Sequence, residues 1–166
     1  MAVITVRSLL LAKSGELTPI EAVLPGQRRW HSIDGAIELT VGETPVLTAA
    51  LRDDVGDLWV YIAAMVAKVA QGEAEAETHF PDQPVLFRLS RRGGGMMEAR
   101  CEAGPRVQRA VTAETELLRA LCEAGIAFFD HLDRLGAPSL NFQQARVILT
   151  ECLEGLPARR AEYWET

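Results

Sequence analysis

The chain has 166 residues, of which 48% are hydrophobic and 24% charged, and 17 basic against 23 acidic residues give a formal net charge of −6. This size fits one globular domain spanning residues 1–166, which buries enough surface to fold without disulfides or metals. The acidic balance argues against non-specific binding to nucleic acid or to an anionic membrane, because both need a basic surface.

The cysteines and the N-terminal segment favour a cytoplasmic protein. The three cysteines are widely spaced, which is not the pattern of a disulfide framework or of a CxxC metal or redox pair. Arg7 interrupts the apolar N-terminal run, and no small-residue cleavage site follows, so the run does not match a signal peptide. Lys68 interrupts the longest apolar helix, and no uncharged run is long enough to cross a membrane.

The first fifty residues have the pattern of strands and tight turns. Residues 3–12 are rich in β-forming side chains, and residues 17–24 follow after a turn, with Pro19 favouring an edge position. Residues 36–41 alternate between apolar and polar, which is the period of a half-buried strand. A Gly-Glu-Thr loop then predicts a hairpin into a strand over residues 45–51.

A helix begins after Asp53 and Asp54, either of which can cap it, and ends at Gly72. The apolar residues recur at helical spacing; they are Val55, Leu58, Trp59, Ile62, Val66 and Val69. Residues 72–84 follow as a proline-braced connecting loop, because prolines stop a helix there. Residues 84–92 and 95–103 then predict a second hairpin around the segment RRGGG.

Two further helices complete the predicted fold. One runs from about residue 112 to residue 135, the other from about residue 141 to residue 154, and residues 157–166 form a C-terminal tail. This order predicts an α+β fold, in which the N-terminal strands and the later hairpin form an antiparallel sheet with about three helices on one face.

The segment FFDHLD, residues 128–133, places two carboxylates beside a histidine. On a helix at about 100° per residue, the two phenylalanines face the core, whereas His131 and Asp133 point roughly 160° apart. A carboxylate that orients a catalytic histidine must come within hydrogen-bond reach of it, so this segment predicts no catalytic pair. Asp130 precedes Arg134 by four residues, which suits an exposed ion pair.

Six residues are candidates for a partner or ligand surface. Arg91 and Arg92 adjoin a glycine-rich hairpin tip, where they could bind an anion or an acidic surface. The glycines lie between two predicted strands and do not precede a helix, so the segment is not a typical phosphate-binding loop. His79 and Asp82 lie in the proline-braced loop, and a lone His–Asp pair is a weak metal signal. The C-terminal tail contains Tyr163 and Trp164, an aromatic pair of the kind that is enriched at protein interfaces. Alternatively, the tail folds back and this pair packs on the domain.

The sequence contains no GxSxG, HExxH, GxGxxG or P-loop motif, and no cofactor is expected. The favoured interpretation is a non-catalytic protein that binds an unidentified protein partner or itself, such as an inhibitor or immunity-type protein. The alternative is a small enzyme or ligand-binding domain, with dispersed polar residues around a pocket between sheet and helices.

Overall fold

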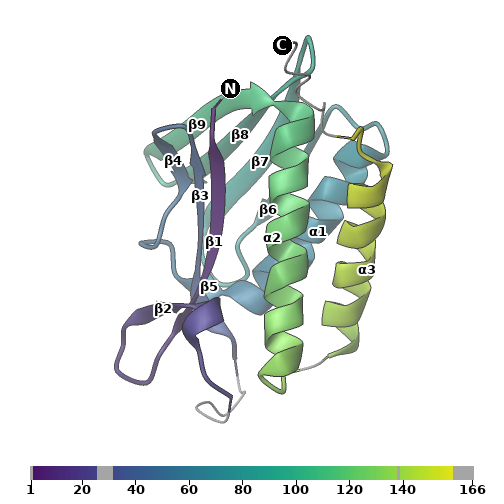
Figure 1. Ribbon diagram of the computed structural model, residues 1–166. Coiled ribbons are helices and arrows are strands. Elements are labelled where there is room, and N and C mark those ends of the chain that lie inside the picture. The colour runs from purple at the N-terminus through teal and green to yellow at the C-terminus, as the bar shows by residue number, and fades with distance from the viewer. Residues whose placement is uncertain (1, 26–31, 138, 159–166) are drawn as a thin grey trace, which may run out of the picture.

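The structure is a computed structural model that describes residues 2–25, 32–137 and 139–158. Its strands lie on one side of the molecule and its helices on the other (Figure 1). The first sheet is antiparallel with the order β2-β1-β3-β4, and β5 pairs with β3. Its elements are β1 Ile4–Leu11, β2 Leu17–Pro19, the short helix η1 Ile20–Ala22, β3 Asp34–Val41, β4 Thr44–Leu47 and β5 Asp53–Asp54.

The second sheet is an antiparallel meander with the order β6-β7-β8-β9, and its edge strand β9 contacts β4 of the first sheet. The strands are β6 Glu75–His79, β7 Val85–Gly93, β8 Met96–Ala103 and β9 Arg106–Ala113. Alternate residues of the two central strands are buried toward the helices; they are Val85, Phe87 and Leu89 of β7 and Met97, Ala99 and Cys101 of β8. Because side chains alternate along a strand, the residues between them lie on the opposite face.

Two of the three helices cover the sheets. The helices are α1 Val55–Ala70, α2 Glu114–Arg134 and α3 Leu140–Gly155. Helix α1 contacts β3 and β6, helix α2 contacts β1 and β9, and α3 packs against α1 and α2. The Asp57 N–H donates to Asp54 Oδ1 at 2.9 Å, which caps the first turn of α1 as expected. None of the helices in the described part of the chain is long and apolar enough to span a membrane.

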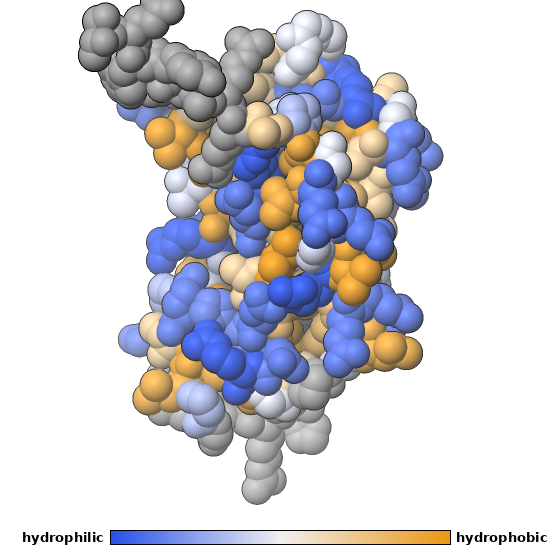
Figure 2. Space-filling model, turned by 45° about the vertical axis from the view of Figure 1, so that its right-hand side comes forward, coloured by the Kyte–Doolittle hydropathy of each residue, from blue (hydrophilic) through white to orange (hydrophobic). Residues whose placement is uncertain are grey.

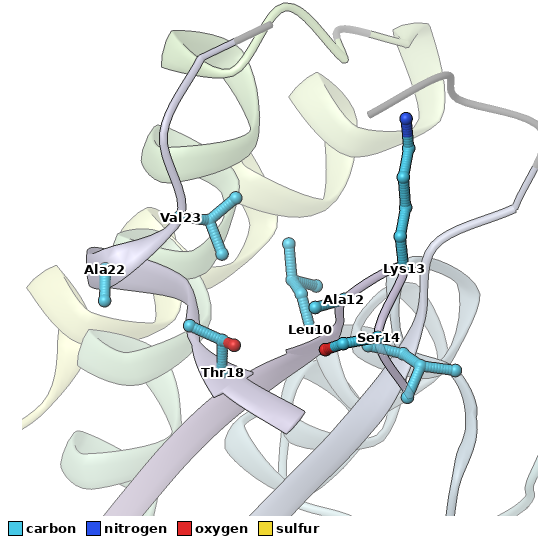
Figure 3. A pocket seen from close by; sticks show the side chains of 8 residues that line it. Leu10, Ala12, Lys13, Ser14, Thr18, Ala22 and Val23 are labelled. Carbon is cyan, nitrogen blue, oxygen red and sulfur yellow. The ribbon is translucent and has the colours of Figure 1, made fainter. Parts of the chain in front are cut away.

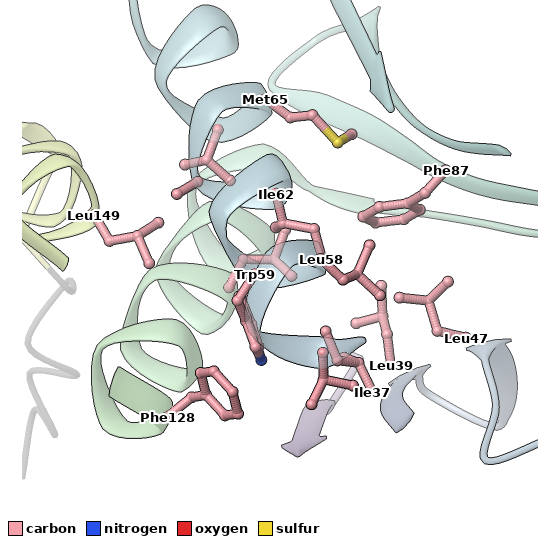
Figure 4. Packing of buried hydrophobic residues seen from close by; sticks show 14 of the residues in the cluster. Ile37, Leu39, Leu47, Leu58, Trp59, Ile62, Met65, Phe87, Phe128 and Leu149 are labelled. Carbon is pink, nitrogen blue, oxygen red and sulfur yellow. The ribbon is translucent and has the colours of Figure 1, made fainter. Parts of the chain in front are cut away.

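The core lies between the sheets and the helices and is centred on Trp59 (Figure 4). The Trp59 indole is fully buried, and its Nε1–H donates to the buried Ser8 Oγ on β1 at 3.0 Å. Gly125 of α2 lets the three helices approach closely, since an added Cβ would lie 2.4 Å from Leu149 Cδ1 and 3.0 Å from the Trp59 ring. Phe128 packs against Trp59 with ring centroids 6.1 Å apart, which confirms that FFDHLD turns its aromatics inward.

The predicted α+β fold with antiparallel strands and three helices is confirmed, but the N-terminal strands and the later hairpin form two sheets instead of one. Two strands differ from the predicted pattern. Residues 72–84, which were predicted to be a connecting loop, contain the edge strand β6. Only Ala76 of this strand is buried, so the sequence has almost no apolar alternation that would indicate a strand. The sequence pattern also did not predict β9, whose Val107 and Val111 point to solvent.

Candidate functional site

One face of the second sheet is turned away from the helices, and it is called the outer face below. It consists of the residues that alternate with the buried ones on each strand. They are Glu75, Glu77 and His79 of β6; Leu86, Arg88, Ser90 and Arg92 of β7; Met96, Glu98, Arg100 and Glu102 of β8; and Val107, Arg109 and Val111 of β9.

The strand register brings three arginines into a row across the outer face. Arg88 of β7 pairs directly with Arg100 of β8, and Arg100 pairs directly with Arg109 of β9. Like charges that lie directly opposite each other on neighbouring strands destabilise a sheet. The row is therefore expected to be electrostatically unfavourable within the sheet.

The three arginines differ in how they are neutralised. Arg88 Nε and Nη2 donate to Glu77 Oε2 at 2.9 and 2.6 Å, and this hydrogen bond raises the pKa of Arg88. Arg100 Nε donates to Glu102 Oε1 at 2.8 Å. Arg109 forms no ion pair with any residue that the structure describes. The cation nearest the β9 edge is thus the one without a carboxylate.

Apolar side chains flank this cation. Val107 and Val111 lie two residues to either side of Arg109 on the same face of β9, and they are 43% and 49% exposed. Met96 at the start of β8 is 39% exposed and also belongs to the outer face. This part of β9 therefore combines an arginine, a residue type that is enriched at protein interfaces, with exposed apolar groups, and no helix in the described part of the chain covers it.

Two of the residues predicted from the sequence lie on the outer face. His79 is exposed at the end of β6. Arg92 Nη2 donates to Glu98 Oε2 at 2.6 Å, and it covers that carboxylate so well that Glu98 is only 5% exposed. Arg92 therefore already has an internal anion.

Arg91 points to the opposite side and links three segments of the fold. Its Nε donates to Glu114 Oε1 at 2.5 Å, its Nη1 to the Glu73 carbonyl at 2.5 Å, and its Nη2 to the Val69 carbonyl at 2.6 Å. These acceptors belong to the C-terminal end of α1, the segment after it, and the first residue of α2. The donors of Arg91 thus hold the helix ends together, and the structure separates Arg91 from Arg92.

The remaining sequence candidates do not converge with these residues. Asp82 is exposed, and its N–H donates to Asp53 Oδ2 at 3.1 Å, which fixes the loop before β7 against the start of α1. Tyr163 and Trp164 lie outside the described residues, as does His31. Neither the predicted aromatic surface nor its fold-back alternative is therefore tested.

Nδ1 of His131, in the FFDHLD segment, contacts Nη2 of Arg134 within the same helix α2. His79 lies on β6, which packs against a different helix, α1. Asp130 pairs with Arg146 of α3, whose Nε lies 2.6 Å from Oδ1. The expected ion pair between Asp130 and Arg134 is wrong, because the neighbouring helix offers a cation that sequence spacing does not reveal.

A cavity of about 420 Å³ lies at the other end of the molecule, beside the β1–β2 hairpin and η1. In Figure 3, Thr18, Ala22 and Val23 lie on one side of it and Lys13 and Ser14 on the other. Among the described residues, the lining contains neither a carboxylate nor an imidazole, so these side chains offer no general acid–base pair.

The cysteines are poorly suited to act as nucleophiles. Burial raises the pKa of Cys101 to about 11 and that of Cys122 to about 12, which keeps both thiols protonated near neutral pH. Within the described ranges, no group of three or more His, Cys, Asp or Glu residues is arranged to hold a metal ion.

The helical side of the molecule also carries exposed apolar residues. Figure 2 brings forward the side on which α3 lies, and there hydrophilic side chains interrupt the hydrophobic ones. Val147 of α3 is 52% exposed and Leu140 is 69% exposed, but singly exposed apolar residues are ordinary on protein surfaces. No family model, curated protein or solved structure matches the chain, so the site rests on geometry alone.

Proposed function

We propose that this chain is a non-catalytic binding domain that docks a protein partner through the outer face of the second sheet. The observation that carries the proposal is the row of Arg88, Arg100 and Arg109, in which the last cation has no carboxylate among the described residues. An inhibitor or immunity-type protein would need only such a surface, with a few anchoring side chains and no catalytic group.

The energetics of the row support a role in binding. Stability alone would favour a neutral or acidic side chain opposite Arg100, yet Arg109 occupies that position. Departures from local structural preferences are expected at functional sites, where another requirement outweighs stability. The apolar exposure of Val107 and Val111 on the same strand is a second departure of this kind, because both would be better placed facing the core.

Site-specific photo-cross-linking in the native host tests the proposal. The photoreactive amino acid p-benzoylphenylalanine would replace Val107 on the outer face and, as a matched control, the similarly exposed Val147 on α3. We expect a discrete cross-linked protein from position 107 that is absent from position 147. Equal labelling from both positions, or no adduct from position 107, would contradict docking through the outer face.

A second candidate function is binding of a small apolar ligand in the cavity beside the β1–β2 hairpin. Its volume of about 420 Å³ falls within the usual range of ligand pockets, and Leu10, Leu11 and Val23 give it an apolar lining. A Thr18→Phe substitution would place a larger side chain in part of this space. If the cavity is the site, this variant loses the fluorescence enhancement of an added anilinonaphthalene dye, while the outer-face cross-link is unaffected.

A further inference from the structure

We infer that the partner presents a carboxylate to Arg109, set between apolar groups that contact Val107 and Val111, so that the outer face recognises an acidic protein segment. This inference rests on the proposed function and specifies the chemistry of the partner. It follows from the arrangement of three consecutive outward residues on β9 and from the pairing of the other two arginines.

The geometry of β9 couples the cation to its apolar neighbours. Outward residues of one strand are about 6.6–6.8 Å apart, since each residue advances the chain by about 3.3–3.4 Å. A partner that covers both Val107 and Val111 therefore also covers the guanidinium of Arg109 between them. Covering the valines is favourable because it removes exposed apolar surface from water.

Desolvation of Arg109 then determines the chemistry of the partner. A cation that is taken out of water without an opposite charge destabilises the complex, whereas a carboxylate with good geometry offsets that loss and accepts two parallel hydrogen bonds. Arg88 and Arg100 already have Glu77 and Glu102. A single additional carboxylate at Arg109 would therefore neutralise the whole row.

Other classes of macromolecule fit the outer face less well. A nucleic acid needs several cations for its consecutive phosphates, whereas Arg109 is the one arginine of the outer face without a carboxylate among the described residues, and the chain as a whole carries a net charge of −6. A second copy of the chain would offer the same outer face, on which Glu77, Glu98 and Glu102 are each bound to an arginine of their own sheet, so Glu75 on the edge strand β6 is the one carboxylate that remains there. A different protein with an acidic segment offers more carboxylates to Arg109, which has no ion pair among the described residues.

The test is selection of binders from a phage library of random 12-residue peptides against the immobilised wild-type protein, followed by affinity measurement. The matched variants are Arg109→Thr, which removes the cation, and Arg106→Thr, which removes an exposed cation from the same strand but not from the outer face. We expect enriched peptides to contain carboxylates, to lose affinity by roughly thirtyfold or more against Arg109→Thr, and to bind Arg106→Thr as they bind the wild type.

The possible outcomes separate this inference from the proposed function. Peptides without carboxylates, no enrichment, or equal affinity for the wild type and Arg109→Thr would overturn the inference. Suppose that the selected peptides bind the wild type and Arg109→Thr equally but do not bind Val107→Asp, or that position 107 still cross-links a protein. Docking through the outer face then stands, and only the acidic chemistry of the partner is wrong. Circular dichroism of each variant verifies that it is folded before its affinity is compared.

Discussion

Replacing Arg109 with threonine should stabilise the folded protein while it removes the proposed binding cation. In the wild type, Arg109 lies directly opposite Arg100 and has no carboxylate among the described residues. Threonine removes the like-charge pair and is itself a favourable strand residue, because its β-branched side chain suits the pleated sheet. The free energy of unfolding should therefore rise, which is unusual for a substitution within a sheet.

The magnitude follows from the register of the strands. A directly opposed cross-strand pair contributes roughly 0.2–1 kcal/mol, so removing one repulsive pair should stabilise the fold by about 0.5 kcal/mol at low ionic strength. Both side chains reach solvent, and salt screens exposed charges over a Debye length of about 10 Å at 0.1 M and about 3 Å at 1 M. Most of the gain should accordingly disappear in 1 M sodium chloride.

Urea denaturation followed by circular dichroism, at 0.02 M and 1 M sodium chloride, measures this effect. Arg88→Thr is the matched control, because it removes a cation from the same row but also breaks two hydrogen bonds to Glu77. Its gain should be smaller than that of Arg109→Thr, or reversed. If Arg109→Thr destabilises the protein, or its gain is the same at both salt concentrations, the row is not a site of electrostatic repulsion.

Three other predictions concern the core, the thiols and the start of α1. Ser8→Ala removes the acceptor of the buried Trp59 Nε1–H and should lower the free energy of unfolding in urea by about 1–3 kcal/mol. Cys101 and Cys122, with pKa values of about 11 and about 12, should resist Ellman's reagent at pH 8 until the protein is unfolded. The pKa of Asp57 is raised, first by desolvation and then by neighbouring aspartates, so its ionised form opposes folding at neutral pH. Asp57→Asn should therefore raise the urea midpoint at pH 7, and this advantage should shrink as the pH falls toward the ordinary pKa of 3.8, where the wild-type carboxyl becomes protonated.

The helices were predictable because their apolar stripes are long. The stripe from Val55 to Val69 matches α1, and the predicted helix over residues 112–135 differs from α2 Glu114–Arg134 by only a few residues at the ends. The strands β6 and β9 were not predictable in the same way. In β9 the valines face solvent, whereas the alternating pattern of a half-buried strand is normally read with its apolar residues facing the core. The alternation of Val107 and Val111 was therefore not recognised as a strand.

The candidate site was harder to predict because it exists only through strand pairing. Arg88, Arg100 and Arg109 belong to three strands and share no linear motif. Gly104 and Pro105, which form the turn between β8 and β9, were the sequence signal for a third strand in this meander. A three-stranded register through that turn would have placed the arginines in a row.

Arg91 and Arg109 show how a structural cation differs from the cation that we propose for binding. From the sequence, Arg91 was a candidate together with Arg92 because they adjoin a glycine-rich loop, and Arg109 was not a candidate, but two of the three acceptors of Arg91 are backbone carbonyls near the end of α1. Such acceptors cannot be recognised in a sequence, since every residue has a carbonyl and only the fold determines which carbonyls lie within reach of a side chain. Arg109 lies opposite another arginine, so we expect its row to destabilise the isolated domain and the proposed partner's carboxylate to offset that repulsion. If the proposed function is correct, stability and binding are opposed at Arg109, and a single substitution there tests both.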